Sequence, residues 1–260
     1  MATAESKTRA QPAVDPQRLY EATAAAAEFY THQLPGHQPA MDYLQSRGIA
    51  DVAAPGSPWQ IGVAPPGWRG LLNHLAPRFS VEEQLAAGLL THNRTGGLID
   101  RFRDRLVFPI ADRTGQIAGF TGRDLSGRPR IPKWVNSPDT AIYAKSRLLY
   151  GLGPQLQHRP PGQATPLVVV VEGAADALAV WRMAQTMPHR PNGIPIYAAA
   201  PCGTNLTTQQ LQLLQEQLPA GSRLAVALDG DAAGRAGFLR AYPLLRHWPG
   251  RAWAMTLPAG

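Results

Sequence analysis

Two short apolar runs, each ending in acidic residues, limit the fold of this chain more than any other feature. The first run, at 167–171, is one leucine and four valines, and Glu172-Gly173 follows it. The second, at 224–228, ends in Asp229-Gly230-Asp231. A short apolar run bounded by turn residues is typical of a buried strand, and a helical pattern follows each one. We therefore predict an α/β fold with a parallel sheet flanked by helices.

The acidic residues that follow these strands predict a metal site. Ligands of an open α/β sheet collect beyond the carboxyl ends of its strands. Four carboxylates should meet there: Glu172, Asp176, Asp229 and Asp231. They repel one another unless a hard cation lies between them, and oxygen-only ligation suits Mg²⁺. The alternative is structural: Glu172 would cap the following helix, and Asp229-Gly230 would be an ordinary turn.

The chain carries an excess of positive charge that is concentrated in its middle. The formal net charge is +7, and the isoelectric point calculated from the sequence is about 10.0. Between Arg94 and Arg147 there are eleven Lys and Arg residues against five Asp residues. Such a stretch suggests a polyanionic partner such as a nucleic acid. The alternative is a solvated, arginine-rich surface without a specific partner.

Several classes of protein are excluded by what the sequence lacks. Cys202 is the only cysteine, so there is no disulfide framework and no cysteine-based zinc site. We expect Cys202 to be a small buried residue. The first residues lack the apolar segment of a signal peptide, and no run approaches the ~18 apolar residues of a membrane span. We therefore expect a soluble, cytoplasmic protein without membrane contact.

Periodicity and turn residues predict a helical and β first half and an α/β second half, with a boundary near 153–166. Helices are expected at 17–32, 39–48, 71–76, 81–88 and 207–218, and residues 144–150 are expected to be partly helical. Strands are expected near 59–68, at 106–110 and 116–123, which a turn at 112–115 would join as a hairpin, and at 253–257. Residues 127–138 should form a basic loop.

The motifs of this chain resemble those of a known family. The acidic pair, Glu172-Gly173-x-x-Asp176 and Asp229-Gly230-Asp231, resembles the Mg²⁺-binding Toprim domain of bacterial primases, topoisomerases and some nucleases. The other motifs look like the catalytic core of bacterial DnaG-type primases. They are IGVAPPGW at 61–68, RFRDRLVFPI at 101–110, GFTGR at 119–123, PKWVNSP at 132–138, IYAK at 142–145 and LYG at 149–151. Their order and spacing agree from about residue 17 to residue 260.

The resemblance implies a fold and an activity. A Toprim domain would occupy 156–260, truncated at its C-terminal end, after a basic nucleic-acid- and nucleotide-binding subdomain at 17–155 and a disordered lead-in at 1–16. The activity would be that of a DNA primase, which makes short RNA primers on single-stranded DNA by metal-dependent nucleotidyl transfer. Nucleoside triphosphates and the template would be its ligands, and a replicative helicase is a further expected partner.

The resemblance also assigns roles to residues. The four Toprim acids would bind Mg²⁺ or Mn²⁺, and Glu172, Asp229 and Asp231 would be catalytic. Basic and polar residues of the other subdomain would handle the template, the nucleotide or the nascent RNA: Arg103, Arg105, Arg123, Lys133, Asn136 and Lys145. Trp134, between Lys133 and Asn136, is a weaker candidate for stacking on a base.

Two departures from the family pattern matter. DnaG-type primases carry an N-terminal zinc-binding domain, and this chain has no zinc ligand set. The family continues after the last strand into an Asp-Pro-Asp segment and a helical subdomain, whereas this chain stops at Gly260. We therefore expect either part of a longer protein or a shortened variant with an incomplete metal site.

Two other functions stay open at this point. The chain could be a nucleic-acid-binding or helicase-docking module of a plasmid, phage or conjugative element that has lost synthesis. It could also be a Toprim nuclease, although the primase-like motifs of the first half argue against that.

Overall fold

The structure is a computed structural model that describes residues 14–54, 56–159, 162–187, 193–201, 203 and 206–256. Most of the expected lead-in, Cys202 and the end of the last expected strand lie outside the described residues. The first helix, α1, begins at Pro16, where the Asp15 side chain accepts a hydrogen bond from the Gln17 amide. Among the described residues, no helix is long and apolar enough to cross a membrane.

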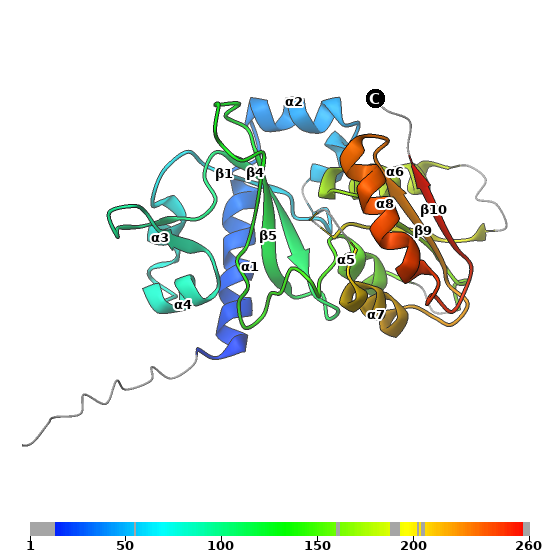
Figure 1. Cartoon of the computed structure of the whole chain (residues 1–260). Coiled ribbons are helices and arrows are strands. Elements are labelled where there is room, and N and C mark those ends of the chain that lie inside the picture. The colour runs from blue at the N-terminus through cyan, green and yellow to red at the C-terminus, as the bar shows by residue number, and fades with distance from the viewer. Residues whose placement is uncertain are drawn as a thin grey trace, which may run out of the picture.

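The first half of the chain combines helices with a small antiparallel sheet (Figure 1). Its elements are α1 (Pro16–His32), α2 (Gln38–Ser46), the 3₁₀ turn η1 (Ala50–Ala53), β1 (Gly62–Ala64), α3 (Gly70–Leu75), α4 (Val81–Ala86), β2 (Leu90–His92), β3 (Leu98–Asp100), β4 (Arg105–Ala111), β5 (Ile117–Asp124) and β6 (Trp134–Asn136). The sheet order is β1-β4-β5-β6, and β2 and β3 form a separate hairpin.

The long helix α1 lies against this sheet at a point that only glycine permits. A Cβ atom on Gly62 of β1 would come within 2.3 Å of the Tyr30 carbonyl carbon. Tyr30 itself is buried and packs edge-on against Phe120 of β5, with ring centroids 5.5 Å apart. This close approach holds the antiparallel sheet against α1, and the sheet carries most of the basic motifs.

The second half is a parallel α/β unit. Its elements are α5 (Leu152–Gln157), β7 (Leu167–Val170), α6 (Ala174–Thr186), β8 (Ile196–Ala199), α7 (Thr208–Gln217), β9 (Arg223–Leu228), α8 (Ala232–Leu245) and β10 (Ala252–Thr256). The sheet order is β10-β9-β7-β8, and all three pairings are parallel. The predicted α/β fold with a parallel sheet is therefore confirmed, and β7 and β9 are its two central strands.

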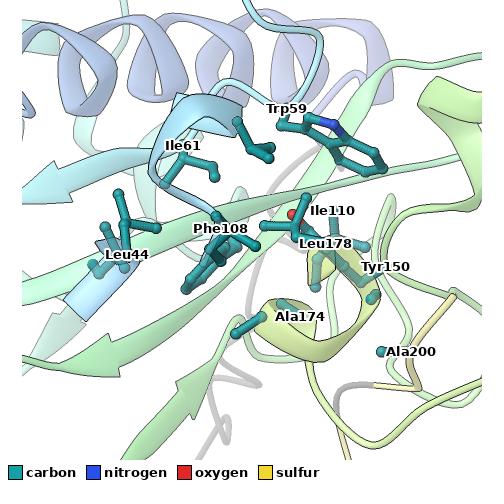
Figure 2. Packing of buried hydrophobic residues seen from close by; sticks show 14 of the residues in the cluster. Leu44, Trp59, Ile61, Phe108, Ile110, Tyr150, Ala174, Leu178 and Ala200 are labelled. Carbon is teal, nitrogen blue, oxygen red and sulfur yellow. The ribbon is translucent and has the colours of Figure 1, made fainter. Parts of the chain in front are cut away.

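The two faces of this sheet pack against different neighbours. Val168 and Val170 of β7 share a core cluster with residues of α7 and α8. The opposite face packs on α6 and on the first half of the chain in a second cluster, which contains Leu178 of α6 together with Phe108, Trp59 and Tyr150 (Figure 2). One hydrophobic core therefore spans both halves and fixes the relative positions of the two sheets.

The sequence predicted most long elements to within a few residues. At the start of α4, Ser80 and Glu83 form a capping box. The expectation of a partial helix at 144–150 is wrong, because residues 145–147 form a turn and Tyr150 makes an isolated bridge to Ala200. Side chains at the start of α7 donate to the carbonyl groups of Lys145, Ser146 and Leu148. The strands β2, β3, β6 and β8 and the helix α5 were not predicted.

Candidate active site

The acidic residues lie at one edge of the parallel sheet. Strands β7 and β9 are direct neighbours, with Val170 opposite Val226. Glu172 lies two residues beyond the end of β7, and Asp229 directly follows β9. Asp176 lies in the first turn of α6. Asp231 is the N-cap of α8 and accepts a 2.8 Å hydrogen bond from the Gly234 amide.

Glu172 connects the two strand ends and does not cap its own helix. The N-cap of α6 is Gly173, and no side chain in the described part of the chain makes a capping hydrogen bond there. Instead a Glu172 carboxylate oxygen accepts a hydrogen bond from the Asp229 amide, at 3.1 Å. The turn after β9 is also tightly packed, because a Cβ atom on Gly234 would come within 2.0 Å of the Asp229 carbonyl oxygen. The structural alternative for Glu172 therefore does not apply.

The electrostatics of this edge are unfavourable without a cation. Burial raises the pKa of Glu172, and the charges of Asp229, Asp231 and Asp176 raise it further, while the hydrogen bond from the Asp229 amide lowers it. Burial and the charge of Asp229 also raise the pKa of Asp176, while the guanidinium of Arg47 lowers it. The four carboxylates therefore act on one another, which is what an oxygen-only site for a hard divalent cation requires.

The four acidic side chains do not point to one common position. Within the described part of the chain, no three acidic, histidine or cysteine side chains are arranged to hold a metal ion. The donor set nevertheless fits Mg²⁺ or Mn²⁺, because it is made only of carboxylates. Of the four, only Asp176 makes an ion pair within the described residues, at 4.0 Å from Arg47.

A cavity of about 440 Å³ separates these acids from a wall built by the first half of the chain. On the acidic side it is lined by Glu172, Asp176 and Asp229. Facing them are residues of α2, β5, β6 and the loops around them: Tyr43, Arg47, Thr121, Lys133, Trp134, Asn136 and Lys145. The cavity thus combines carboxylates with cationic and amide side chains, which is an arrangement suited to a ligand that carries phosphate groups and a metal.

The structure places the six predicted binding residues in four settings. Lys133, Asn136 and Lys145 line the cavity. The guanidinium of Arg123 lies behind this wall, 5.2 Å from the ring centroid of Tyr43 and 5.9 Å from that of Trp134.

Arg105 and Arg103, like Arg123, are not among the lining residues of the cavity. Arg105 is only 5% exposed, and it donates to the carbonyl oxygens of Gly122 and Pro132 at 3.2 and 2.9 Å. It therefore supports the loop that carries Lys133. Arg103 lies on another part of the surface, with its guanidinium 4.6 Å from the ring centroid of the exposed Trp68.

Sequence reasoning missed Arg47, Tyr43 and Thr121 as residues of the cavity. Arg47 is the C-cap residue of α2 and makes the ion pair with Asp176. A single arginine after a short amphipathic helix carries no motif, so only its ion pair with the first turn of α6 reveals its place.

Comparisons with known proteins now bear on this site. Residues 29–155 match the family model for the DNA primase catalytic core, N-terminal domain, and residues 169–260 match that for Toprim-like domains. The RNA polymerase domain of Mycobacterium tuberculosis primase DnaG is 32% identical, with a TM-score of 0.77 over 95% of this chain and 77% of that one. This chain belongs to the DnaG primase catalytic-core family. The fold and the resemblance predicted from the sequence are confirmed.

Curated DnaG-family relatives are longer than this chain. The DNA primase of Deinococcus radiodurans is 38% identical over 93% of this chain but only 39% of its own length. The DNA primase of Pseudomonas aeruginosa is 38% identical over 90% of this chain and 33% of its own length. A solved DnaG primase catalytic domain bound to ssDNA is 33% identical, with a TM-score of 0.71, over 94% of this chain and 74% of that one. The chain therefore spans less than two-fifths of these curated primases.

Proposed function

We propose that this chain is a primase catalytic core that synthesises short RNA primers on single-stranded DNA from nucleoside triphosphates. The observation that carries the proposal is the cavity with carboxylates at the ends of β7 and β9 on one side and Lys133, Asn136 and Lys145 on the other. Membership of the DnaG family and the 35–38% identity to bacterial DNA primases support it.

The residues of the cavity have different roles in the proposed nucleotidyl transfer. Lys133 and Lys145 bind the triphosphate, and Arg47 adds a third cation from α2. Asn136 supplies an amide that orients sugar or phosphate oxygens. These groups hold the nucleotide so that its α-phosphate faces the 3′-hydroxyl of the growing primer. The 3′-hydroxyl attacks that phosphorus, and pyrophosphate leaves.

The acidic residues would hold the divalent metal. Glu172, Asp229 and Asp231 are the proposed catalytic ligands, and Asp176 completes the set. A bound Mg²⁺ or Mn²⁺ would lower the pKa of the attacking hydroxyl and neutralise charge on the phosphates. The chain itself fixes the ligand positions: the Asp229 amide holds Glu172, and the Gly234 amide holds Asp231.

We assign the single-stranded template to the surface around Arg103 and Trp68. Trp68 is 61% exposed, and the guanidinium of Arg103 lies over its ring. An exposed aromatic ring with an adjacent arginine is a stacking platform for bases of any sequence. A DnaG catalytic domain of the same family has been solved with ssDNA bound. A replicative helicase as partner and a cytoplasmic location belong to the same proposal.

A primer-synthesis assay tests the proposed function. The reaction would contain labelled nucleoside triphosphates, single-stranded template and Mg²⁺ or Mn²⁺, and would compare the parent chain with Asp229→Ala and with Glu216→Ala, an exposed acid outside the cavity. We expect Asp229→Ala to abolish synthesis with little loss of stability, and Glu216→Ala to behave like the parent. Template-dependent synthesis by Asp229→Ala would contradict the assignment of the acidic site.

The same assay separates the proposal from its alternatives. Including a chain that continues past Gly260 shows whether further residues are needed for activity. Template binding without synthesis in both chains would instead support a docking module, and metal-dependent nicking of plasmid DNA would support a nuclease.

A further inference from the structure

The segment that carries Lys145 into the cavity is bonded to the start of α7. The side-chain amide of Gln210 donates to the Lys145 carbonyl at 3.0 Å and to the Leu148 carbonyl at 2.8 Å. The Thr207 hydroxyl donates to the Ser146 carbonyl at 2.7 Å. Three of the four carbonyl groups of residues 145–148 are thus held by two side chains of the parallel α/β unit, although the segment follows directly after the basic motifs.

The same two side chains form the capping box of α7. The Thr207 hydroxyl accepts from the Gln210 amide, and the Gln210 side-chain oxygen accepts from the Thr207 amide, both at 3.0 Å. Gln210 is 1% exposed. Both hydrogens of its NH₂ group and its oxygen therefore have partners, and a buried amide satisfied in this way has one orientation. The start of α7 is a fixed point to which the 145–148 segment is tied.

The side chain of Lys145 extends from this anchored backbone and packs against Gly203. A Cβ atom on Gly203 would lie 2.6 Å from Lys145 Cε and 3.0 Å from Nζ, so the side chain runs directly against the Gly203 backbone. Its own amide donates to the Asp139 carboxylate at 3.2 Å. From there Lys145 reaches the cavity wall shared with Glu172 and Asp229.

We infer that Thr207 and Gln210 are positioning residues, which set the place where the Lys145 ammonium meets a nucleoside triphosphate. The inference rests on the proposed function, because that function assigns the triphosphate to Lys145. A long lysine side chain on an untethered turn would sample many positions, whereas the two donors on α7 hold its backbone at a fixed distance from the metal-binding edge.

Two substitutions separate this role from helix capping. Gln210→Glu keeps the side-chain oxygen that accepts from the Thr207 amide, and Thr207→Asp keeps an oxygen that accepts from the Gln210 amide. When ionised, neither new side chain can donate to the carbonyl groups of 145–148. Thr207→Ser retains both the cap and the donor, and therefore serves as the matched control. Thr207→Asp decides the matter if Gln210→Glu does not fold, because Gln210 is the more buried of the two.

The experiment measures ATP affinity in the presence of Mg²⁺ by calorimetric titration, together with kcat and KM for nucleotide in primer synthesis. We expect Gln210→Glu and Thr207→Asp each to weaken ATP binding about tenfold and to raise KM more than they lower kcat. Thr207→Ser should match the parent. In a Lys145→Ala background, the two donor-removing substitutions should have no further effect. In a Lys133→Ala background, they should keep their full effect, because Lys133 lies on a loop that α7 does not hold.

The outcomes distinguish the inference from the proposed function. Equal losses of affinity in the Lys145→Ala and parent backgrounds, or unchanged affinity in folded donor-removing variants, would overturn the positioning role and leave the primase assignment in place. Binding that is unaffected by Lys145→Ala would overturn the positioning role and the assignment of the triphosphate to Lys145, whereas a parent chain that binds no nucleotide and makes no primer would overturn the proposed function as well.

Discussion

At the scale of single residues, a basic motif contains side chains with different tasks. Arg103 and Arg105 are two positions apart, yet one lies over an exposed tryptophan and the other is buried under the cavity wall. Burial lowers the pKa of Arg105, although the nearby charge of Asp124 opposes that effect. The cost of burying this cation is offset by hydrogen bonds to two carbonyl groups.

Substitution of the two arginines should therefore affect different properties, stability for Arg105 and DNA binding for Arg103. Arg105→Met should lower the free energy of unfolding by about 2 kcal/mol, because it removes charged hydrogen bonds to the loop that carries Lys133. Arg103→Ala should leave stability nearly unchanged and weaken single-stranded DNA binding several-fold. Urea denaturation and fluorescence anisotropy with a labelled oligonucleotide measure these two quantities. An Arg105→Met chain with parent stability would show that the buried guanidinium does not support the loop.

Glu172 gives a prediction about metal and pH. Its pKa is raised in the folded chain, so the ionised carboxylate is less favourable there than in the unfolded chain. Its contribution to stability therefore declines as the pH rises from the ordinary value through the raised one. In EDTA at neutral pH, Glu172→Gln should melt at a higher temperature than the parent, because it removes one repelling charge and keeps the oxygen that accepts from Asp229.

Adding Mg²⁺ should reverse that order or close the gap. The cation stabilises the folded parent by binding to it, and the variant offers a weaker ligand. Thermal melts with EDTA and with excess MgCl₂ make the comparison, and Asp42→Asn, an exposed acid on α2, is the control. A larger Mg²⁺ shift in Glu172→Gln than in the parent would contradict a metal site at this edge.

At the scale of helices and strands, length decides what a sequence can predict. Helices α1 and α7 and strands β4 and β5 are long enough for their apolar spacing to be recognised. Strands β2, β3 and β6 have three residues each, which is too few for alternation to show. The prediction of a partial helix at 144–150 was wrong for a different reason. Two carbonyl groups of this segment accept hydrogen bonds from a side chain of α7, which lies about sixty residues further along the chain.

The candidate site could also be predicted only in part. The four acids could be predicted because each follows a strand or begins a helix in a recognisable motif. Arg47 and Tyr43 could not, because they reach the cavity only through the tertiary fold, which brings the end of α2 to the acidic edge of the other half.

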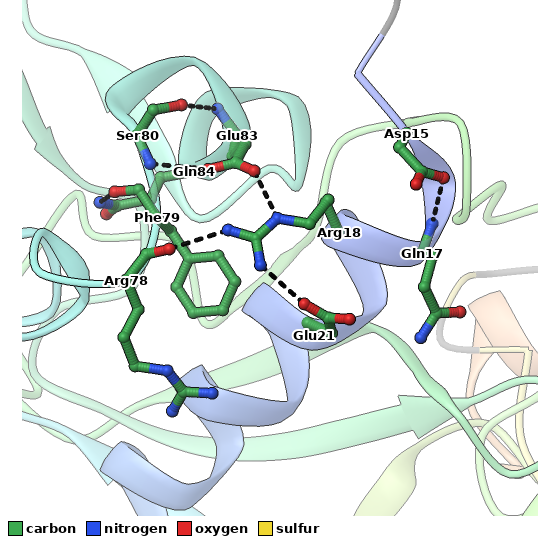
Figure 3. A network of polar contacts seen from close by, with 9 residues as sticks. All are labelled: Asp15, Gln17, Arg18, Glu21, Arg78, Phe79, Ser80, Glu83 and Gln84. Carbon is green, nitrogen blue, oxygen red and sulfur yellow. Dashed lines mark hydrogen bonds and ion pairs between the residues drawn. The ribbon is translucent and has the colours of Figure 1, made fainter.

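Helix α4 is joined to α1 by an ion pair that the pH should control. The Arg18 guanidinium contacts Glu83 and Glu21, each at 2.7 Å, and also donates to the Arg78 carbonyl (Figure 3). The hydrogen bond from Arg18 is the main cause that lowers the pKa of Glu83. A lowered carboxyl pKa contributes stability above its ordinary value, and that stability is lost as the pH falls through the lowered value.

We therefore expect Glu83→Gln to melt at a lower temperature than the parent at pH 7, and the difference to shrink as the pH falls below the ordinary carboxyl pKa and on through the lowered pKa of Glu83. Melting temperatures of both chains across that range would show it. Because Gln at this position retains the capping box, the change isolates the ion pair. A difference that stays constant with pH would assign the effect to packing instead.

At the scale of the whole molecule, one core joins the two halves. Trp59 is central to this core, with its ring centroid 5.2 Å from that of Trp181 and 5.9 Å from that of Tyr150. Asp51 and Arg182 add an ion pair across the same boundary, at 2.6 Å. The indole N–H of Trp59 is buried and has no hydrogen-bond partner among the described residues. The residue therefore contributes through its apolar surface alone.

Trp59→Phe should consequently cost less than about 1.5 kcal/mol of stability, since it keeps an aromatic ring and removes an unsatisfied donor. Trp59→Ala should cost about 3–5 kcal/mol, because it leaves a cavity between the halves. Urea denaturation followed by circular dichroism and by fluorescence tests both values. Trp59→Phe should also retain a single transition, whereas equal costs for the two substitutions would show that the ring does not fill the boundary.

The shared core has a thermodynamic consequence for ligand binding. Because the two walls of the cavity are parts of one packed body, the cavity cannot close on a nucleotide by a hinge motion without exposing Trp59, Phe108 and Leu178 to water. Binding should therefore bury little apolar surface beyond that of the nucleotide itself. Calorimetry at several temperatures should then give a small heat-capacity change for ATP binding, in contrast to the large negative value expected for an enzyme whose domains clamp down on their substrate.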